Sequence, residues 1–238
     1  AFLKEIQRQT EEASTLNWVA DTYRTIGDGI KGQGQDHVYF YTQAKSAYEK
    51  MLALSKRKAG YLKPGMIQQI NFRVALTDRG LGEHKSAINS LVEILKKNSK
   101  LLNIQVEAVR TYQEWGKTGK AGLYGLAIRG ARPNRKGGKN VVWGWAKIAR
   151  LTAGKKSYKA VFQEARFNLA NCRYLQAMKT ADQAKKKALL NRAKRSINGT
   201  LRAYSDVGGS DWEKRYDDLM KNVQRALGEK ATGINRKK

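Results

Sequence analysis

The sequence predicts an all-α protein built as an α-solenoid of stacked antiparallel helix pairs, and three observations support this prediction. Only 2 prolines occur among the 238 residues, so long helices need not be interrupted. Good helix formers such as Ala, Leu, Lys, Gln and Arg are abundant, whereas alternating runs of β-branched residues are scarce. Gly82 and Ala87 recur as Gly116 and Ala121, and this offset of 34 residues is typical of a repeating helix-turn-helix unit.

The first helix pair is expected before residue 60. Residues 2–31 have helical spacing, with Leu16, Val19, Ala20 and Tyr23 on one face. A polar, glycine-rich connection, GDGIKGQGQD, follows them, and HVYFYTQAKSAYEKMLAL then predicts the second helix. This first pair is therefore longer than the 34-residue unit.

The regular units are expected in residues 67–133, after the break at Pro64 and Gly65. Ala87, Leu91 and Leu95 lie on one apolar stripe, and another helix is expected from about residue 102. The segment KAGLYGLAIRG that follows is rich in glycine. Its helix should therefore be short or poorly packed.

The C-terminal part is expected to continue the same solenoid. After the basic loop ARPNRKGGKN, the segment NVVWGWAKIARL predicts a helix, and longer helices are expected at about residues 158–178, 182–204 and 212–227. The last of these should cap the stack. We expect helix pairs in residues 1–133, basic helical repeats with the capping helix in 134–228, and a flexible basic tail in 229–238, which has little apolar content.

The two regular units match a known repeat pattern through Ala75, Gly82, Ala87, Leu91, Val109, Tyr112, Gly116, Ala121 and Pro133. On these residues the chain resembles the tetratricopeptide repeat (TPR) proteins, and segments such as WGWAKIARL look similar to repeat proteins of bacteria. The resemblance implies a solenoid whose concave face binds a peptide or a partner domain and performs no chemistry. The concave groove would be lined by Phe72, Leu76, Arg79, Val106, Arg110 and Gln113. These positions lack the Lys and Asn set with which some TPR proteins hold a C-terminal carboxylate.

Positive charge is the second large feature of the sequence. The formal net charge is +27, of which residues 120–238 carry +21. Between Lys120 and Arg202 there are 21 basic residues, and only Glu164 and Asp182 are acidic. Such an excess favours polyanionic neighbours, which include acidic proteins and nucleic acid. The residues expected to bind them are Arg129, Arg132, Arg135, Lys136, Lys139, Lys147, Arg150, Lys155, Lys156, Lys185, Lys186, Lys187, Arg192, Lys194 and Arg195.

Two functions from different classes follow from these features. The first is a non-enzymatic scaffold or structural subunit that mediates protein-protein interaction or assembly, with acidic partners or its own copies. The second is a protein that binds nucleic acid without reading sequence, because Trp143, Trp145 and Tyr158 lie among the basic residues and are suited to stack on bases. The same aromatic residues would equally serve as core.

No constellation of residues supports an enzyme, a cofactor or a metal. Gly27, Gly29 and Gly32 have the order of a dinucleotide-binding fingerprint, but a helix precedes them where a strand is required. His37 and His84 have no carboxylate or cysteine at a spacing that would complete a metal site or a catalytic triad.

Cysteine usage and hydropathy exclude two further classes of protein. The single cysteine, Cys172, excludes an internal disulfide framework, and its setting in FNLANCRYL predicts a buried thiol. No run of 18 apolar residues predicts a membrane span, so a soluble chain is expected. Because the sequence begins at Ala1, removal of a signal peptide and origin in a longer chain both stay open.

Overall fold

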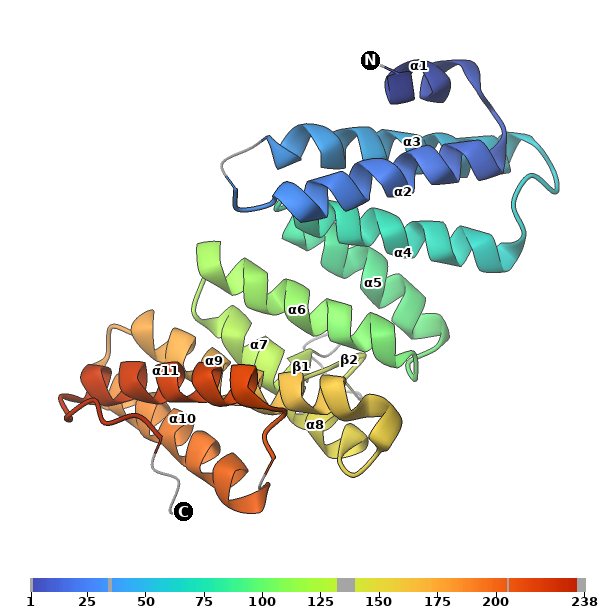
Figure 1. Cartoon of the computed structure of the whole chain (residues 1–238). Helices are drawn as coiled ribbons and strands as arrows, with labels where there is room; N and C mark the ends of the chain where they lie inside the picture. Colours follow the sequence, from blue (N-terminus) through green and yellow to red (C-terminus); the bar gives the residue numbers. More distant parts are fainter. Residues whose placement is uncertain (1, 34–35, 132–139, 205, 235–238) are drawn as a thin grey trace. The chain divides into compact units, whose positions relative to one another are not determined.

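The computed structural model describes residues 2–33, 36–131, 140–204 and 206–234. It divides into two compact units, Ala1–Asn98 and Ser99–Lys238, which we call the N-terminal and C-terminal units. Packed α-helices dominate both units, which confirms the all-α class (Figure 1). Along the chain, the division between the units falls between residues 98 and 99.

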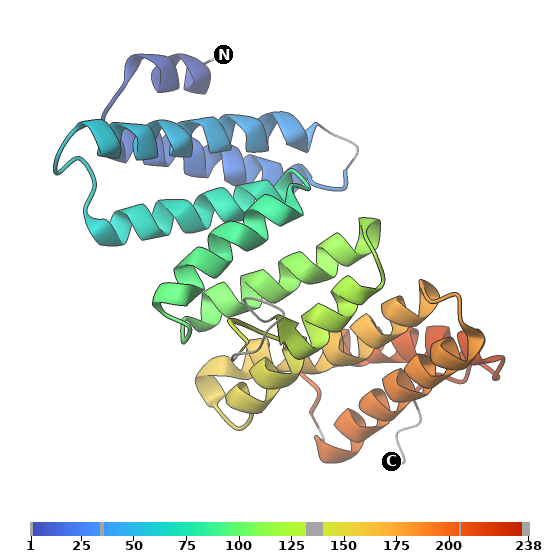
Figure 2. The same ribbon diagram turned by 180° about the vertical axis from the view of Figure 1, so that it is seen from behind.

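The N-terminal unit consists of helices only, over the residues described. They are α1 (Phe2–Gln9), α2 (Ala13–Ile30), α3 (His37–Arg57), α4 (Pro64–Gly80) and α5 (His84–Lys97). Helices α2 and α3 pack against each other along their length, and α4 packs on α3 and on α5 (Figures 1 and 2). Pro64 is the first residue of α4, where its missing N–H is not needed.

An aromatic side chain packed against glycine holds the N-terminal helices close together. Tyr41 of α3 is 1% exposed. A Cβ atom added to Gly27 of α2 would lie 3.2 Å from its ring, and one added to Gly80 of α4 would lie 2.6 Å from it. Glycine is therefore needed at Gly80 because the ring occupies the space of a side chain. The four residues expected on one face of the first long helix, from Leu16 to Tyr23, are all buried as predicted.

The C-terminal unit is arranged around one central helix. Its elements are α6 (Leu102–Thr118), α7 (Gly122–Arg129), β1 (Gly130–Ala131), β2 (Val142–Trp143), α8 (Trp145–Thr152), the 3-10 helix η1 (Lys156–Tyr158), α9 (Lys159–Met178), α10 (Gln183–Ala203) and α11 (Ser210–Leu227). Helix α9 packs against α7, α8, α10 and α11. As expected, α7 is short, but Tyr124 and Ala127 within it are buried.

Two short strands, which the sequence did not predict, tie the segments on either side of residue 133 together. Strand β1 pairs antiparallel with β2, so that Gly130 lies opposite Trp143. Gln105, fully buried in α6, holds β2 in place. Its Oε1 accepts a hydrogen bond from the Trp143 N–H at 2.6 Å, and its Nε2 donates to the Val141 carbonyl at 2.8 Å.

The helix boundaries correct the 34-residue spacing expected for the regular units. Helix α4 begins at Pro64 and α6 at Leu102, while α5 begins at His84 and α7 at Gly122, so both intervals are 38 residues. Gly82 lies in a turn with φ of 79°, a conformation that favours glycine. Gly116 instead lies inside α6, where a Cβ would be 2.7 Å from the Tyr124 ring. The two glycines thus have different structural roles.

Part of the expected flexible tail lies against α11. The Gly233 N–H donates to Gln224 Oε1 and the Ile234 N–H donates to Asp217 Oδ1, both at 2.9 Å. Ile234 also packs on the apolar cluster that α9, α10 and α11 share. Two polar side chains of α11 therefore hold residues 232–234, which apolar content alone did not predict. Residues 235–238 lie outside the described part of the chain.

Candidate functional site

Helix α10 presents six of the basic residues that the sequence singled out. Asp182 caps its N-terminus, since Oδ1 accepts a hydrogen bond from the Lys185 N–H at 2.9 Å. Leu190, Ala193 and Ile197 are buried on one side of the helix, in the cluster shared with α9 and α11. The basic side chains consequently take the remaining positions, which are Lys185, Lys186, Lys187, Arg192, Lys194 and Arg195.

Most of the charge on α10 has no acidic counterpart. Lys185 pairs with Asp182 at 3.3 Å and Lys194 pairs with Glu229 at 2.5 Å. The other four cations have no carboxylate oxygen within 4.0 Å in the part of the chain that the structure describes. They are Lys186, Lys187, Arg192 and Arg195. We call these four residues the α10 cations.

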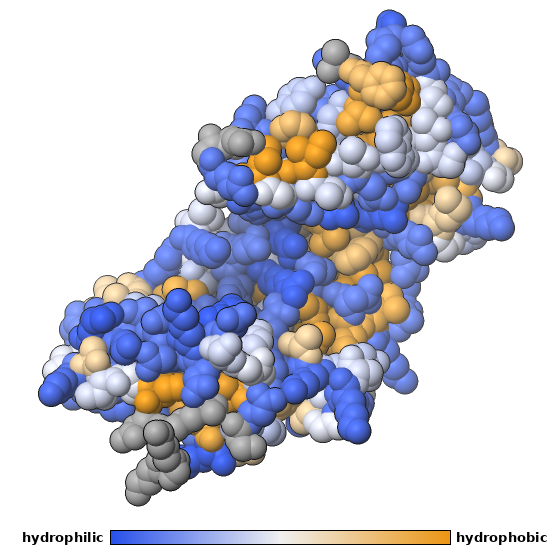
Figure 3. Space-filling view, viewed as in Figure 1, coloured by the Kyte–Doolittle hydropathy of each residue, from blue (hydrophilic) through white to orange (hydrophobic). Residues whose placement is uncertain are grey.

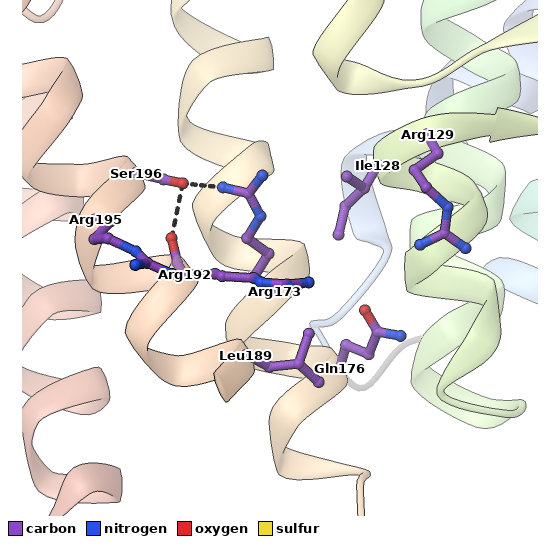
Figure 4. A pocket seen from close by; sticks show the side chains of 8 residues that line it. All are labelled: Ile128, Arg129, Arg173, Gln176, Leu189, Arg192, Arg195 and Ser196. Carbon is purple, nitrogen blue, oxygen red and sulfur yellow. Dashed lines mark hydrogen bonds between the residues drawn. The ribbon is translucent and has the colours of Figure 1, made fainter. Parts of the chain in front are cut away.

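Four arginines gather at a cavity of about 470 Å³ in the C-terminal unit (Figure 4). Arg129 is the last residue of α7, Arg173 lies in α9, and Arg192 and Arg195 lie one turn apart on α10. The remaining lining residues are Ile128, Gln176, Leu189 and Ser196, so no described acidic side chain lines the cavity. We call this cavity the arginine pocket.

Arg173 is the member of the arginine pocket that sequence reasoning missed. Its Nη1 donates a hydrogen bond to Ser196 Oγ, and that hydroxyl donates to the Arg192 carbonyl at 2.9 Å (Figure 4). Burial, and then the nearby charges of Arg192 and Arg195, lower the pKa of Arg173 from its ordinary value. The guanidinium is therefore held beside like charges with a neutral partner, an arrangement that suits an anion.

A second basic group lies around α8 and η1, where aromatic residues accompany it. Lys147 Nζ lies 4.5 Å from the centre of the Trp143 ring, and Lys155 Nζ lies 5.9 Å from that of Tyr158. Trp145 is fully buried, and its Nε1 donates to Gln113 Oε1 at 2.9 Å. Trp145 therefore belongs to the core, and Lys147 lies over Trp143.

Two of the remaining basic candidates are exposed, and four lie outside the described residues. Arg150 and Lys156 are exposed near the same group. Four others lie outside the described residues, namely Arg132, Arg135, Lys136 and Lys139. Hydrophilic residues cover most of the face of the molecule seen in Figure 3.

The six residues expected to line a concave groove divide between the two units. Phe72, Leu76 and Arg79 are partly buried in α4 of the N-terminal unit.

The other three make contacts inside the C-terminal unit. Val106 is buried, and Arg110 Nε donates to Glu164 Oε1 of α9 at 2.7 Å. Gln113 Nε2 donates to Asn168 at 2.9 Å. The contacts of Arg110 and Gln113 join α6 to α9. Because Val106 is itself buried, it does not line an open surface.

Cys172 and Gly27, two of the residues considered for chemistry, lie in packed surroundings. Cys172 is fully buried, burial raises the pKa of its thiol, and Sγ lies 3.3 Å from Gln113 Oε1. Gly27 lies inside α2 against Tyr41, which excludes the strand-turn-helix context of a dinucleotide site. Within the described residues, no three His, Cys, Asp or Glu side chains are grouped as a metal ion would need.

None of the described helices has both the length and the apolarity that crossing a membrane requires. Protein-family models, curated proteins and solved structures gave no match to this chain.

Proposed function

We propose that this chain is a non-enzymatic, TPR-like scaffold or structural subunit that mediates protein-protein interaction or assembly, and that its basic C-terminal unit docks acidic partners. The observation that supports the proposal is the set of α10 cations, which have no carboxylate partner among the described residues. Like charges on one helix repel each other, and an acidic partner relieves that repulsion. Charge complementarity of this kind also speeds association and selects partners.

An acidic protein fits the surface better than a single-stranded nucleic acid does. Proteins that bind single strands without sequence preference combine a basic groove with aromatic rings on which bases stack. Here Trp145 is buried and Lys147 lies over Trp143, which leaves Tyr158, 39% exposed, as the open ring of this group. Sequence-independent nucleic-acid binding is the second candidate, because phosphates would neutralise the same cations.

Assembly with its own copies would use other surfaces. Both parts of the sequence are positively charged, so two copies facing each other through α10 would repel. Repeat proteins instead bind partners along an extended concave surface. The acidic partner is therefore proposed to be a different chain.

A binding titration tests the proposed docking surface. A fluorescently labelled polyglutamate peptide is titrated with the parent chain and with a triple variant of α10, Lys186→Glu, Lys187→Glu and Arg192→Glu. The matched control makes the same change of charge in the N-terminal unit, through Lys56→Glu and Arg57→Glu on α3 and Lys97→Glu on α5, all three exposed. At about 150 mM salt, which screens charges more than about 8 Å apart, the α10 variant should bind at least about tenfold more weakly than the control.

Two results would count against the docking surface. If the α10 variant and the control weaken binding equally, total charge and not the surface of α10 attracts the peptide. If the parent does not bind polyglutamate at this salt concentration, the C-terminal unit does not dock acidic chains.

A further inference from the structure

Four arginines from three helices line the arginine pocket (Figure 4). Arg129 comes from the end of α7, Arg173 from the middle of α9, and Arg192 and Arg195 from neighbouring turns of α10. None of the four lies within 4.0 Å of a carboxylate oxygen in the described part of the chain. The pocket therefore holds four uncompensated positive charges.

Repulsion among these like charges raises the free energy of the chain when no anion is bound. Exposed cations ordinarily move apart into solvent, but Arg173 is partly buried and is held by the Ser196 hydroxyl. The Ser196 oxygen is neutral, so it fixes the position of the guanidinium without cancelling its charge. An anion in the cavity would reduce the repulsion and accept hydrogen bonds from guanidinium N–H groups.

Phosphate is the anion that this chemistry fits best. A guanidinium is a planar fork of five N–H donors that matches two phosphate oxygens at once. One phosphate monoester carries a charge of about −1.5 to −2, so a single group neutralises at most half of the four arginines. Two or three neighbouring phosphates match the charge, and a cavity of about 470 Å³ lies within the range of small-molecule sites, roughly 300 to 1,000 Å³.

We propose that the arginine pocket is a binding site for a compact polyphosphate, a ligand with two or more adjoining phosphate groups. The proposal goes beyond the docking function, because a chain that docks no acidic protein would still hold such a ligand. Polyphosphate groups occur in inorganic chains and in nucleotides. Ile128 and Leu189 supply apolar wall beside the arginines, where the organic part of a nucleotide would lie.

Isothermal titration calorimetry on the full chain tests the proposal. Sodium tripolyphosphate, ATP and inorganic phosphate are each titrated into the chain without divalent cations, at a constant ionic strength of about 150 mM. One tripolyphosphate should bind per chain, at least about tenfold more tightly than inorganic phosphate, which corresponds to about 1.4 kcal/mol. Tighter binding of ATP than of tripolyphosphate would identify a nucleotide as the ligand, and equal or weaker binding would identify an inorganic chain.

Three variants locate the site. Arg195→Gln removes one exposed guanidinium and should weaken tripolyphosphate binding by about tenfold, the effect of losing a charge-assisted hydrogen bond. Arg173→Lys keeps the charge but loses the planar fork, so it should also weaken binding. Arg202→Gln is the matched control, because it removes one exposed guanidinium from the same helix outside the pocket, and it should leave the affinity within about twofold, as expected of a screened charge.

The proposal fails if Arg202→Gln weakens binding as much as Arg195→Gln, since the ligand would then respond to general charge. It also fails if the parent binds tripolyphosphate no more tightly than inorganic phosphate. Circular dichroism establishes that each variant is folded. If Arg173→Lys does not fold, the exposed Arg195→Gln still decides the outcome.

Discussion

The packing of Gly116 against Tyr124 gives a prediction whose size follows from the geometry. Gly116 is buried inside α6, and the Tyr124 side chain of α7 is 1% exposed. A Cβ at residue 116 would lie 2.7, 2.8 and 2.9 Å from three atoms of the ring. Cβ atoms in real proteins essentially never approach another heavy atom this closely, so Gly116→Ala requires the buried ring or the helix to shift.

The expected loss of stability is about 0.5 to 2 kcal/mol. Overfilling a packed core costs about 1 to 3 kcal/mol. Alanine recovers about 0.5 to 1 kcal/mol of this cost, because it is a better helix former than glycine. The matched control is Gly199→Ala in α10, since a Cβ there would meet nothing within 4 Å. That variant should instead gain about 0.5 to 1 kcal/mol.

Urea unfolding followed by tryptophan fluorescence measures both changes. Both glycines and four of the five tryptophans lie in the C-terminal unit, so the signal reports on the unit that is altered. The free energy of unfolding should fall for Gly116→Ala and rise for Gly199→Ala. If Gly116→Ala were as stable as the parent, the close approach of α6 and α7 at Tyr124 would be refuted.

Three further predictions concern packing and ionisation. Leu91 is fully buried in α5, so Leu91→Ala should cost about 2 to 5 kcal/mol in urea unfolding, and a loss below about 1 kcal/mol would show that α5 faces another way. Because burial raises the pKa of the Cys172 thiol, iodoacetamide should not label this thiol in the native chain at neutral pH. The same reagent should label it in denaturant, and rapid labelling of the native chain would contradict its burial. Hydrogen bonds from Lys159 and from the Gly208 and Gly209 amides lower the pKa of Asp206 to about 2. The stability contributed by this carboxylate is thus present above its ordinary pKa of 3.8 and lost as the pH falls towards 2. The NMR amide resonances of Gly208 and Gly209 should therefore titrate with a midpoint near pH 2, and a midpoint near 3.8 would contradict the lowered pKa.

Helix positions were predictable because local signals specify them. The stripe through Ala87, Leu91 and Leu95 is buried as expected, and the long helices of the C-terminal unit begin and end close to their predicted bounds. Pro64 was read as a break between units, and in the structure it starts α4. Periodicity and helix propensity act within a few turns, so sequence alone reveals them.

Contacts between distant residues were not predictable in the same way. The 34-residue offset paired Gly82 with Gly116, although one glycine serves a turn and the other makes room for Tyr124. Strand β2 is held by Gln105, which lies 38 residues earlier in the chain than Trp143. No local pattern signals such a partner.

The candidate site was also only partly predictable from the sequence. Charge counting identified Arg129, Arg192 and Arg195, since basic residues are conspicuous in a sequence with few acids. Arg173 was missed because it follows FNLANC, whose apolar residues predict a helix interior. Its role depends on Ser196 and on arginines that only the packing of α9 with α10 brings near.

A competition titration tests the central claim, that the C-terminal unit docks acidic proteins, most directly. Labelled polyglutamate bound to the chain is displaced by unlabelled polyglutamate or by polyuridylate of equal charge, at about 150 mM salt, where exposed charges are strongly screened. The account predicts that unlabelled polyglutamate displaces the label at a lower concentration than polyuridylate, because the surface offers arginine and lysine but few open aromatic rings. Displacement by polyuridylate at a tenfold lower concentration than by polyglutamate, or about 1.4 kcal/mol in its favour, would contradict the claim and make nucleic acid the partner.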